Sequence, residues 1–156
     1  MTDAGMAHLS GLKKLRILGL QDTQVSDAGL ASFKDCSLEE IYFFRTRIGD
    51  EGLAHLKGMS KMRIVVMRDT LITDDGLACL KGMPDLIQLD VSEVPGITDA
   101  GMAHLVGLKN LKDLNLWFTG VGDAGIEQLT GLTNIKRLNE TASLLKTTEK
   151  SLLKKL

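Results

Sequence analysis

Apolar residues recur along the chain in one short pattern, in which two apolar positions are three apart and a third follows two residues later. The last two positions alternate with variable residues, which is the period of a strand with one buried face. The pattern therefore predicts a series of short β-strands. It occurs at Leu15, Leu18, Leu20; Leu38, Ile41, Phe43; Met62, Val65, Met67; Leu86, Leu89, Val91; and Leu111, Leu114, Leu116, with a degenerate copy at Ile135 and Leu138.

A second pattern lies between these strands. Glycines preceded two residues earlier by aspartate occur at Gly5, Gly29, Gly52, Gly76, Gly101 and Gly125, with successive spacings of 24, 23, 24, 25 and 24 residues. Apolar residues three apart follow each glycine, as at Met6, Leu9 and Leu12, and this spacing forms one face of a short helix. One unit is thus a strand, a turn, a helix and a return, repeated along the chain.

The polar residues of the unit predict how each helix and turn is held. A Ser or Thr before the aspartate, as at Ser26 and Thr73, is expected to accept a hydrogen bond from the free amides at the helix start, and the aspartate favours the positive end of the helix dipole. Glycine in a helix costs about 1 kcal/mol relative to alanine, so its recurrence predicts close approach of a neighbouring unit. We expect hydroxyls in the turn after each strand to bond to backbone groups; they belong to Thr23, Thr46, Thr70 and Thr119.

These motifs resemble those of leucine-rich repeat proteins over about six units, from Thr2 to roughly residue 145. The units are most similar to the cysteine-containing repeats of F-box proteins and to bacterial repeats with a Thr-Asp-x-Gly-Leu helix start. Thr occupies the position where that subtype has Cys and other subtypes have Asn. The resemblance implies an α/β fold, a right-handed solenoid with a parallel sheet on the concave side and short helices on the convex side. It implies a binding scaffold and no enzymatic reaction or cofactor.

We interpret residues 1–156 as one repeat domain, with 133–156 as a degenerate C-terminal cap. The last unit carries Glu140 in a core position, and the next helix start has lost the Asp and Gly of the motif, as terminal repeats often do. No such cap is visible at the N-terminus. Either the chain is a segment of a longer array, or its first strand meets another surface, and we expect weak self-association through this N-terminal edge.

Composition removes several classes of function. The 156 residues carry 19 Lys and Arg against 20 Asp and Glu, a formal net charge of -1, which argues against a nucleic-acid or anionic-membrane partner. Cys36 and Cys79 lie in non-adjacent units, too far apart for a disulfide if the repeat fold is right. They leave the cellular compartment undecided.

Candidate chemistry is sparse. His8, His55 and His104 share one position of the repeat, with Cys79 in the same position of another unit. Neighbouring helices pack about 8 to 10 Å apart, too far for side chains in one row to converge on a metal ion. We therefore expect no metal site. The sequence also has no phosphate-binding glycine loop, nucleophile elbow or Cys-x-x-Cys pair, so we expect no catalytic residues and no cofactor.

The variable strand positions are predicted to form the concave face, and four of the six aromatic residues of the chain fall there. Aromatic side chains are common at the centres of protein interfaces, so we expect a protein or peptide partner, of basic or mixed charge because acidic residues surround the aromatics. The alternative is that the chain is the recognition part of a larger protein, such as a bacterial enzyme or a ubiquitin-ligase-like adaptor. The predicted contact residues are Tyr42, Phe44, Arg45, Arg68, Asp90, Glu93, Asp113, Trp117 and Phe118.

Overall fold

The computed structural model describes residues 1–140, so residues 141–156 of the expected cap lie outside the described part of the chain. The strands are β1 (Ile17–Gly19), β2 (Glu40–Tyr42), β3 (Ile64–Val66), β4 (Gln88–Asp90), β5 (Asp113–Asn115) and β6 (Arg137–Asn139). The helices are α1 (Asp3–Ala7), α2 (Asp27–Leu30), α3 (Asp50–Ala54), α4 (Asp74–Leu77), α5 (Asp99–Met102) and α6 (Asp123–Gln128), and 3-10 turns follow three of them at η1 (Ala31–Phe33), η2 (Ala78–Gly82) and η3 (Leu129–Gly131).

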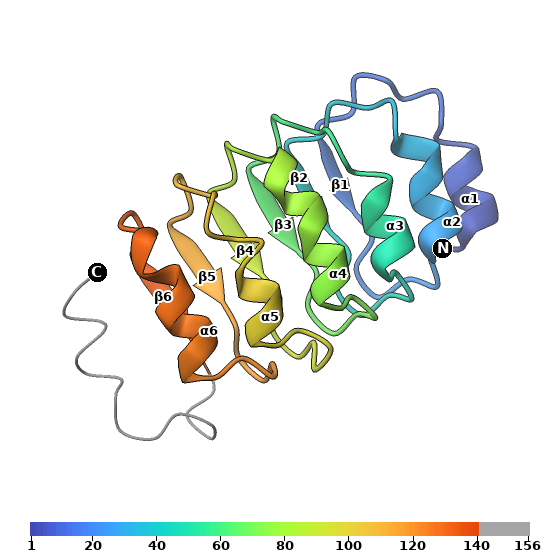
Figure 1. Cartoon of the computed structure of the whole chain (residues 1–156). Coiled ribbons are helices and arrows are strands. Elements are labelled where there is room, and N and C mark those ends of the chain that lie inside the picture. Colours follow the sequence, from blue (N-terminus) through green and yellow to red (C-terminus); the bar gives the residue numbers. More distant parts are fainter. Residues whose placement is uncertain (141–156) are drawn as a thin grey trace.

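The strands form one parallel sheet in the order β1-β2-β3-β4-β5-β6, with a helix between each pair of successive strands. The helices stand side by side in one layer and cover one face of the sheet (Figure 1). Equivalent residues pair without a shift, so that Leu18 lies beside Ile41 and Ile41 beside Val65. The repeat solenoid predicted from the spacing of apolar residues is confirmed.

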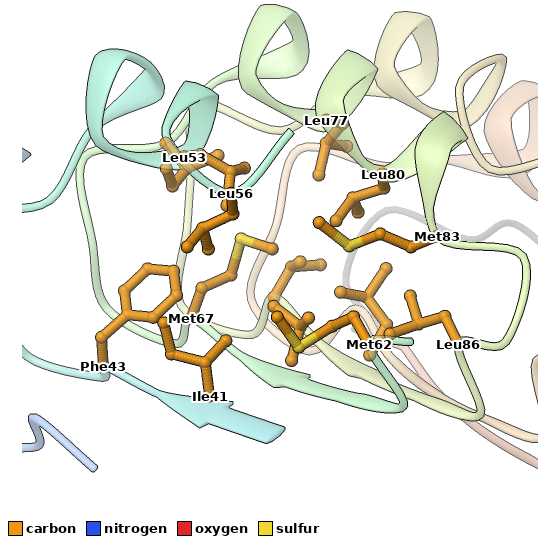
Figure 2. Packing of buried hydrophobic residues seen from close by; sticks show 14 of the residues in the cluster. Ile41, Phe43, Leu53, Leu56, Met62, Met67, Leu77, Leu80, Met83 and Leu86 are labelled. Carbon is orange, nitrogen blue, oxygen red and sulfur yellow. The ribbon is translucent and has the colours of Figure 1, made fainter. Parts of the chain in front are cut away.

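A continuous hydrophobic core fills the space between the sheet and the helices. In Figure 2 the strand side chains of Ile41, Phe43 and Met67 face Leu53 and Leu77 from the helices, and all five are fully buried. Burying a side chain of this size contributes about 1.5 to 3 kcal/mol. No repeat could bury these residues alone, so each unit depends on its neighbours.

The helix-start aspartates of α1 to α5 bond to the next repeat. The capping expectation is confirmed at Thr98 and wrong at Ser26 and Thr73. Thr98 Oγ1 accepts a long hydrogen bond from the Ala100 amide, but the Ser26 and Thr73 side chains accept none from their own helices. Instead their hydroxyls donate to the helix-start aspartate of the preceding repeat, as Thr73 Oγ1 does to Asp50 at 2.6 Å. The carboxylates that accept the following repeat's backbone amide belong to Asp3, Asp27, Asp50, Asp74 and Asp99, and we call them the aspartate ladder.

The aspartate ladder also explains the recurrent glycine. A Cβ atom added at Gly29 would lie 2.6 Å from the Asp3 Oδ1 atom of the preceding repeat. The same carboxylate oxygen accepts the Ser26 amide, so it cannot move away without breaking the bond between repeats. Close approach of the neighbouring unit, as the sequence predicted, is therefore the reason for glycine at this position.

The threonine row behaves as predicted. The hydroxyls of Thr23, Thr46, Thr70 and Thr119 donate to the carbonyl oxygen three residues earlier, each at 2.7 Å. These bonds close the turn that follows each strand. In the fourth repeat the buried Val94 occupies this position, and the turn is completed there by a hydrogen bond from the Ile97 amide to the Val94 carbonyl oxygen.

The first repeat differs from the inner ones because no other described residues cover its outer side. Leu12 is 48% exposed, whereas the equivalent Met59 is 6% exposed. Ile17 on β1 is 56% exposed. At the opposite end Ile135, Leu138 and Glu140 are half-buried. Among the described residues, no helix has the length and apolar character needed to cross a membrane.

Candidate functional site

The face of the sheet that the helices do not cover is the concave face predicted from the sequence. Its residues form four rows that run from repeat to repeat, two across the strands and two just after the strand ends. The rows are Ile17, Glu40, Ile64, Gln88, Asp113, Arg137; Gly19, Tyr42, Val66, Asp90, Asn115, Asn139; Gln21, Phe44, Arg68, Ser92, Trp117; and Asp22, Arg45, Asp69, Glu93, Phe118.

The third and fourth rows lie beyond the ends of the strands, yet the backbone ladder continues through them. The Arg45 amide donates to the Arg68 carbonyl oxygen at 3.0 Å, and the Glu93 amide donates to the Trp117 carbonyl oxygen at 2.8 Å. Phe44 and Trp117 therefore share one row three strands apart, about 15 Å at the usual strand spacing. Arg68 and Ser92 lie between them in the same row.

The fourth row has a backbone feature that the sequence did not suggest. Its five residues all have left-handed backbones with φ between 50° and 59°; they are Asp22, Arg45, Asp69, Glu93 and Phe118. A non-glycine residue in this region costs about 1 to 2 kcal/mol. Asp is tolerant of this conformation, but Arg, Glu and Phe give no such signal. Recurrence of a left-handed residue at one position of the unit could have been found only from the structure.

Phe44 lies between two guanidinium groups. The Arg45 Cζ atom is 5.4 Å from the centre of its ring and the Arg68 Cζ atom is 5.5 Å away. Arg45 also pairs with Asp22, so its charge is compensated within the sheet. Arg68 Nε lies 3.5 Å from a carboxylate oxygen of Glu93 and, among the described residues, is buried without a hydrogen bond. These contacts hold the Phe44 ring in a partly buried position.

Trp117 and Phe118 form the most exposed aromatic pair of the face. Their ring centres are 5.4 Å apart at an angle of 44°, and the two residues are 47% and 62% exposed. The Trp117 amide donates to the side chain of Asn115 at 3.2 Å, which holds the start of the turn. Two large rings thus remain largely exposed in the C-terminal half of the concave face.

The other predicted contact residues are held by polar partners. The Tyr42 hydroxyl donates to Glu40 at 2.8 Å, and burial, followed by this bond, raises the pKa of Tyr42. Asp90 accepts bonds from the amide and hydroxyl of Ser92. Asp113 is paired with Arg137, whose hydrogen bond holds the pKa of the Asp113 carboxyl below its ordinary value.

Two hollows mark the C-terminal half of this face. One, of about 210 Å³, is lined by polar groups that include Asp90, Asp113 and Asn115. The other, of about 430 Å³, lies beside Arg68, Glu93 and Trp117. The structure thus brings Arg68, Asp90, Glu93, Asp113 and Trp117 into one continuous region, while Tyr42, Phe44 and Arg45 lie on the neighbouring strand β2 and its turn.

Comparison with solved structures agrees with this architecture. Internalin C2 (inlC2) from Listeria monocytogenes superimposes with a TM-score of 0.72 and 22% sequence identity, over 86% of this chain and 55% of the internalin chain. Internalin inlF from the same organism gives a TM-score of 0.51 and 17% identity, over 85% of this chain and 49% of the other. Internalins are leucine-rich repeat proteins. This chain has the leucine-rich repeat fold.

The likeness establishes the leucine-rich repeat fold alone, because the sequence identities are low. No protein-family model and no curated protein matches the sequence. The chain spans about half the length of the two internalin chains. The F-box-like and Thr-Asp-x-Gly-Leu subtype indicated by the sequence is not confirmed by these neighbours.

The convex side of this leucine-rich repeat solenoid carries the histidine row. Within residues 1–140 no three His, Cys, Asp or Glu side chains come together in a way that could hold a metal ion. His104 is half-buried, and its Nδ1 atom has no hydrogen-bond partner in the described residues. Cys36 and Cys79 are both free thiols, and burial raises the pKa of Cys79. Neither the histidine row nor the two cysteines form a cluster of reactive side chains in the described residues.

Proposed function

We propose that this chain is a non-enzymatic scaffold that binds a protein or peptide through its concave face. The observation that supports the proposal is the exposure of Trp117 and Phe118 on a surface that the hydrophobic core does not use. Large aromatic side chains are enriched among the residues that dominate interface energies. A face of this kind can exchange water for a partner without disturbing the repeats beneath it.

The charges of the concave face favour a basic or mixed partner segment. Its rows hold six carboxylates, from Asp22, Glu40, Asp69, Asp90, Glu93 and Asp113, against the guanidiniums of Arg45, Arg68 and Arg137. Arg45 and Arg137 are already paired with carboxylates. Asp90 uses one carboxylate oxygen for both of its bonds to Ser92, so the other oxygen is available to a lysine or arginine of the partner.

The test is a binding measurement with aromatic variants. A partner would be captured on the immobilised chain, purified, and titrated against the wild type, Trp117→Ala and Phe118→Ala. We expect each variant to weaken the complex by about 2 kcal/mol or more if the pair is central to the interface. Val106→Ala is the matched control, because Val106 is 42% exposed in the loop after α5. Equal affinities for all four proteins would reject the concave face as the binding surface.

The alternative remains that the chain is the recognition part of a larger protein with an active domain. The exposed outer side of the first repeat, with Leu12 and Ile17 uncovered, supports this candidate, since a further repeat would bury those residues as it does in the inner units. The full reading frame tests it directly. An adjoining repeat array with an attached catalytic domain would favour the alternative over a stand-alone scaffold.

A further inference from the structure

The near-zero net charge of the chain conceals two edges of opposite sign. Figure 1 shows that the loops entering the strands lie along one edge of the solenoid and the loops leaving them along the other. The edge where the helices begin is acidic, with Asp3, Asp27, Asp50, Glu51, Asp74, Asp75, Asp99 and Asp123 in the first turns. The opposite edge, which we call the basic edge, carries the exposed side chains of Lys13, Lys14, Arg16, Lys61, Arg63, Lys109, Lys112 and Lys136.

The acidic edge is explained by the fold, whereas most of the basic edge is not. The aspartate ladder accepts the bonds that join successive repeats. On the basic edge, Lys13 pairs with Asp35, Arg16 with Glu39, and Lys109 donates to the Gly131 carbonyl oxygen. The remaining five side chains form no hydrogen bond or close ion pair within the described part of the chain; they are Lys14, Lys61, Arg63, Lys112 and Lys136. Lys61 and Arg63 are attracted at longer range to Glu39, and Lys112 and Lys136 to Asp113.

The spacing of these cations is set by the sheet. The residue before each strand is linked to its neighbour by a backbone hydrogen bond of 2.7 to 2.8 Å, in the row Arg16, Glu39, Arg63, Ile87, Lys112, Lys136. Cations therefore recur every second strand, about 10 Å apart, from Arg16 through Arg63 to Lys112. A hollow of about 280 Å³ at the N-terminal end of the row is lined by Lys13, Lys14, Arg16, Glu39 and Lys61, among others.

We infer that the basic edge is a second binding surface, separate from the concave face, that takes an extended acidic polypeptide segment. A polyproline II segment repeats every three residues, about 9 Å, so acidic residues three positions apart would meet Arg63 and Lys112 in turn, whereas Arg16 is already paired with Glu39. Glu39 and the half-buried Ile87 interrupt the cations. A peptide can place neutral or apolar side chains opposite these two residues, whereas the uniformly charged backbone of a nucleic acid cannot.

The test is a fluorescence-anisotropy titration of the whole chain with a labelled twelve-residue probe of four Glu-Pro-Leu triplets. Comparison probes are four Gln-Pro-Leu triplets and a twelve-nucleotide oligothymidylate. We expect the acidic peptide to bind at 50 mM salt, to weaken several-fold at 200 mM salt because screening shortens the reach of surface charges, and to bind at least tenfold tighter than the neutral peptide. Failure to bind below 1 mM, or tighter binding of the oligonucleotide, would overturn the inference.

Variants locate the surface. The triple substitution Lys61→Glu, Arg63→Glu and Lys112→Glu should weaken the acidic peptide at least tenfold. A matched pair of single reversals separates position from charge: Arg63→Glu should weaken the acidic peptide several-fold, whereas Arg47→Glu, at an exposed arginine just before α3 on the acidic edge, should leave affinity within twofold. Equal losses in this pair would show attraction to overall charge and reject a defined edge. Trp117→Ala should not change the affinity for the acidic peptide. The proposals for the basic edge and for the concave face can therefore be rejected independently of each other.

Discussion

The two faces of the sheet differ in how much the residue type varies from one repeat to the next. On the core side the row through Leu18, Ile41, Val65, Leu89 and Leu114 is uniformly aliphatic, and each of these residues is at most 6% exposed. One residue further along each strand, the concave row reads Gly19, Tyr42, Val66, Asp90, Asn115 and Asn139. The backbone register is identical in both rows, so the difference comes from what each side chain contacts.

This comparison separates the residues that build the repeat from those available to a partner. The core row must be apolar and of similar volume, because each residue packs against its equivalents in the neighbouring units. The concave row faces solvent and can change from Gly to Tyr to Asp without altering the ladder. Regularity along the chain therefore marks structure, and departure from it marks the candidate binding surface.

The largest test of the comparison uses two adjacent residues after β5. Leu116 is 1% exposed and Trp117 is 47% exposed. We expect Leu116→Ala to lower the free energy of unfolding by about 2 to 5 kcal/mol through lost burial and a cavity, and Trp117→Ala to lower it by about 1 kcal/mol or less. Urea denaturation followed by circular dichroism measures both. If Trp117→Ala unfolds the chain as readily as Leu116→Ala, the assigned concave orientation is wrong.

The sequence was sufficient to predict the strands, the solenoid and the aromatic row, because apolar periodicity reports directly which side chains face a core. It was not sufficient for the aspartate ladder. A helix-start aspartate preceded by Ser or Thr suggests capping within one helix, and nothing in Asp50 or Thr73 shows that the bond crosses to the next repeat. The left-handed backbone of Phe118 could not be predicted either, since phenylalanine has no preference for that conformation.

The aspartate ladder gives the next largest effect. Asp74 accepts the Thr98 amide at 2.8 Å and the Thr98 hydroxyl at 2.6 Å. Asp74→Ala leaves that amide without its partner, and we expect a loss of about 1 to 3 kcal/mol in unfolding free energy. The side chain of the neighbouring exposed Asp75 makes no hydrogen bond to another described residue, so Asp75→Ala is the matched control, with a loss of about 0.5 kcal/mol or less. Equal losses would show that the carboxylates act only through the helix dipole.

Acid should weaken the same ladder at its first member. The hydrogen bond from the Ser26 side chain, followed by that from the Ser26 amide, holds the pKa of Asp3 below its ordinary value. A lowered folded-state pKa adds stability that is fully present above the unfolded value, about 4, and is lost as the pH falls through the folded value. We expect Asp3→Asn and Ser26→Ala each to reduce the loss of stability between pH 5 and pH 3, measured by denaturation midpoints. An undiminished loss in both variants would show that this pair does not contribute.

The smallest expected effect concerns the end of the array, where residues of the core pattern lack a neighbour. Met1, Leu12 and Ile17 are about half exposed on the outer side of the first repeat, and within residues 1–140 the strand β1 pairs on its β2 side alone. Exposed apolar surface beside an unpaired strand edge favours association with another chain. The other end of the sheet is less favourable for pairing, because β6 carries the exposed Arg137 and follows Lys136.

We therefore expect weak association between N-terminal edges, visible as a rise in sedimentation coefficient between about 10 μM and 1 mM if the dissociation constant is in the range of weak complexes. Leu12→Ser with Ile17→Ser should abolish the rise, while Leu71→Ser, at a position 66% exposed in an inner repeat, should not. A monomer at every concentration would mean that the uncovered edge alone does not drive self-association, and the contrast between inner and terminal repeats would then be one of solvent exposure without a binding consequence.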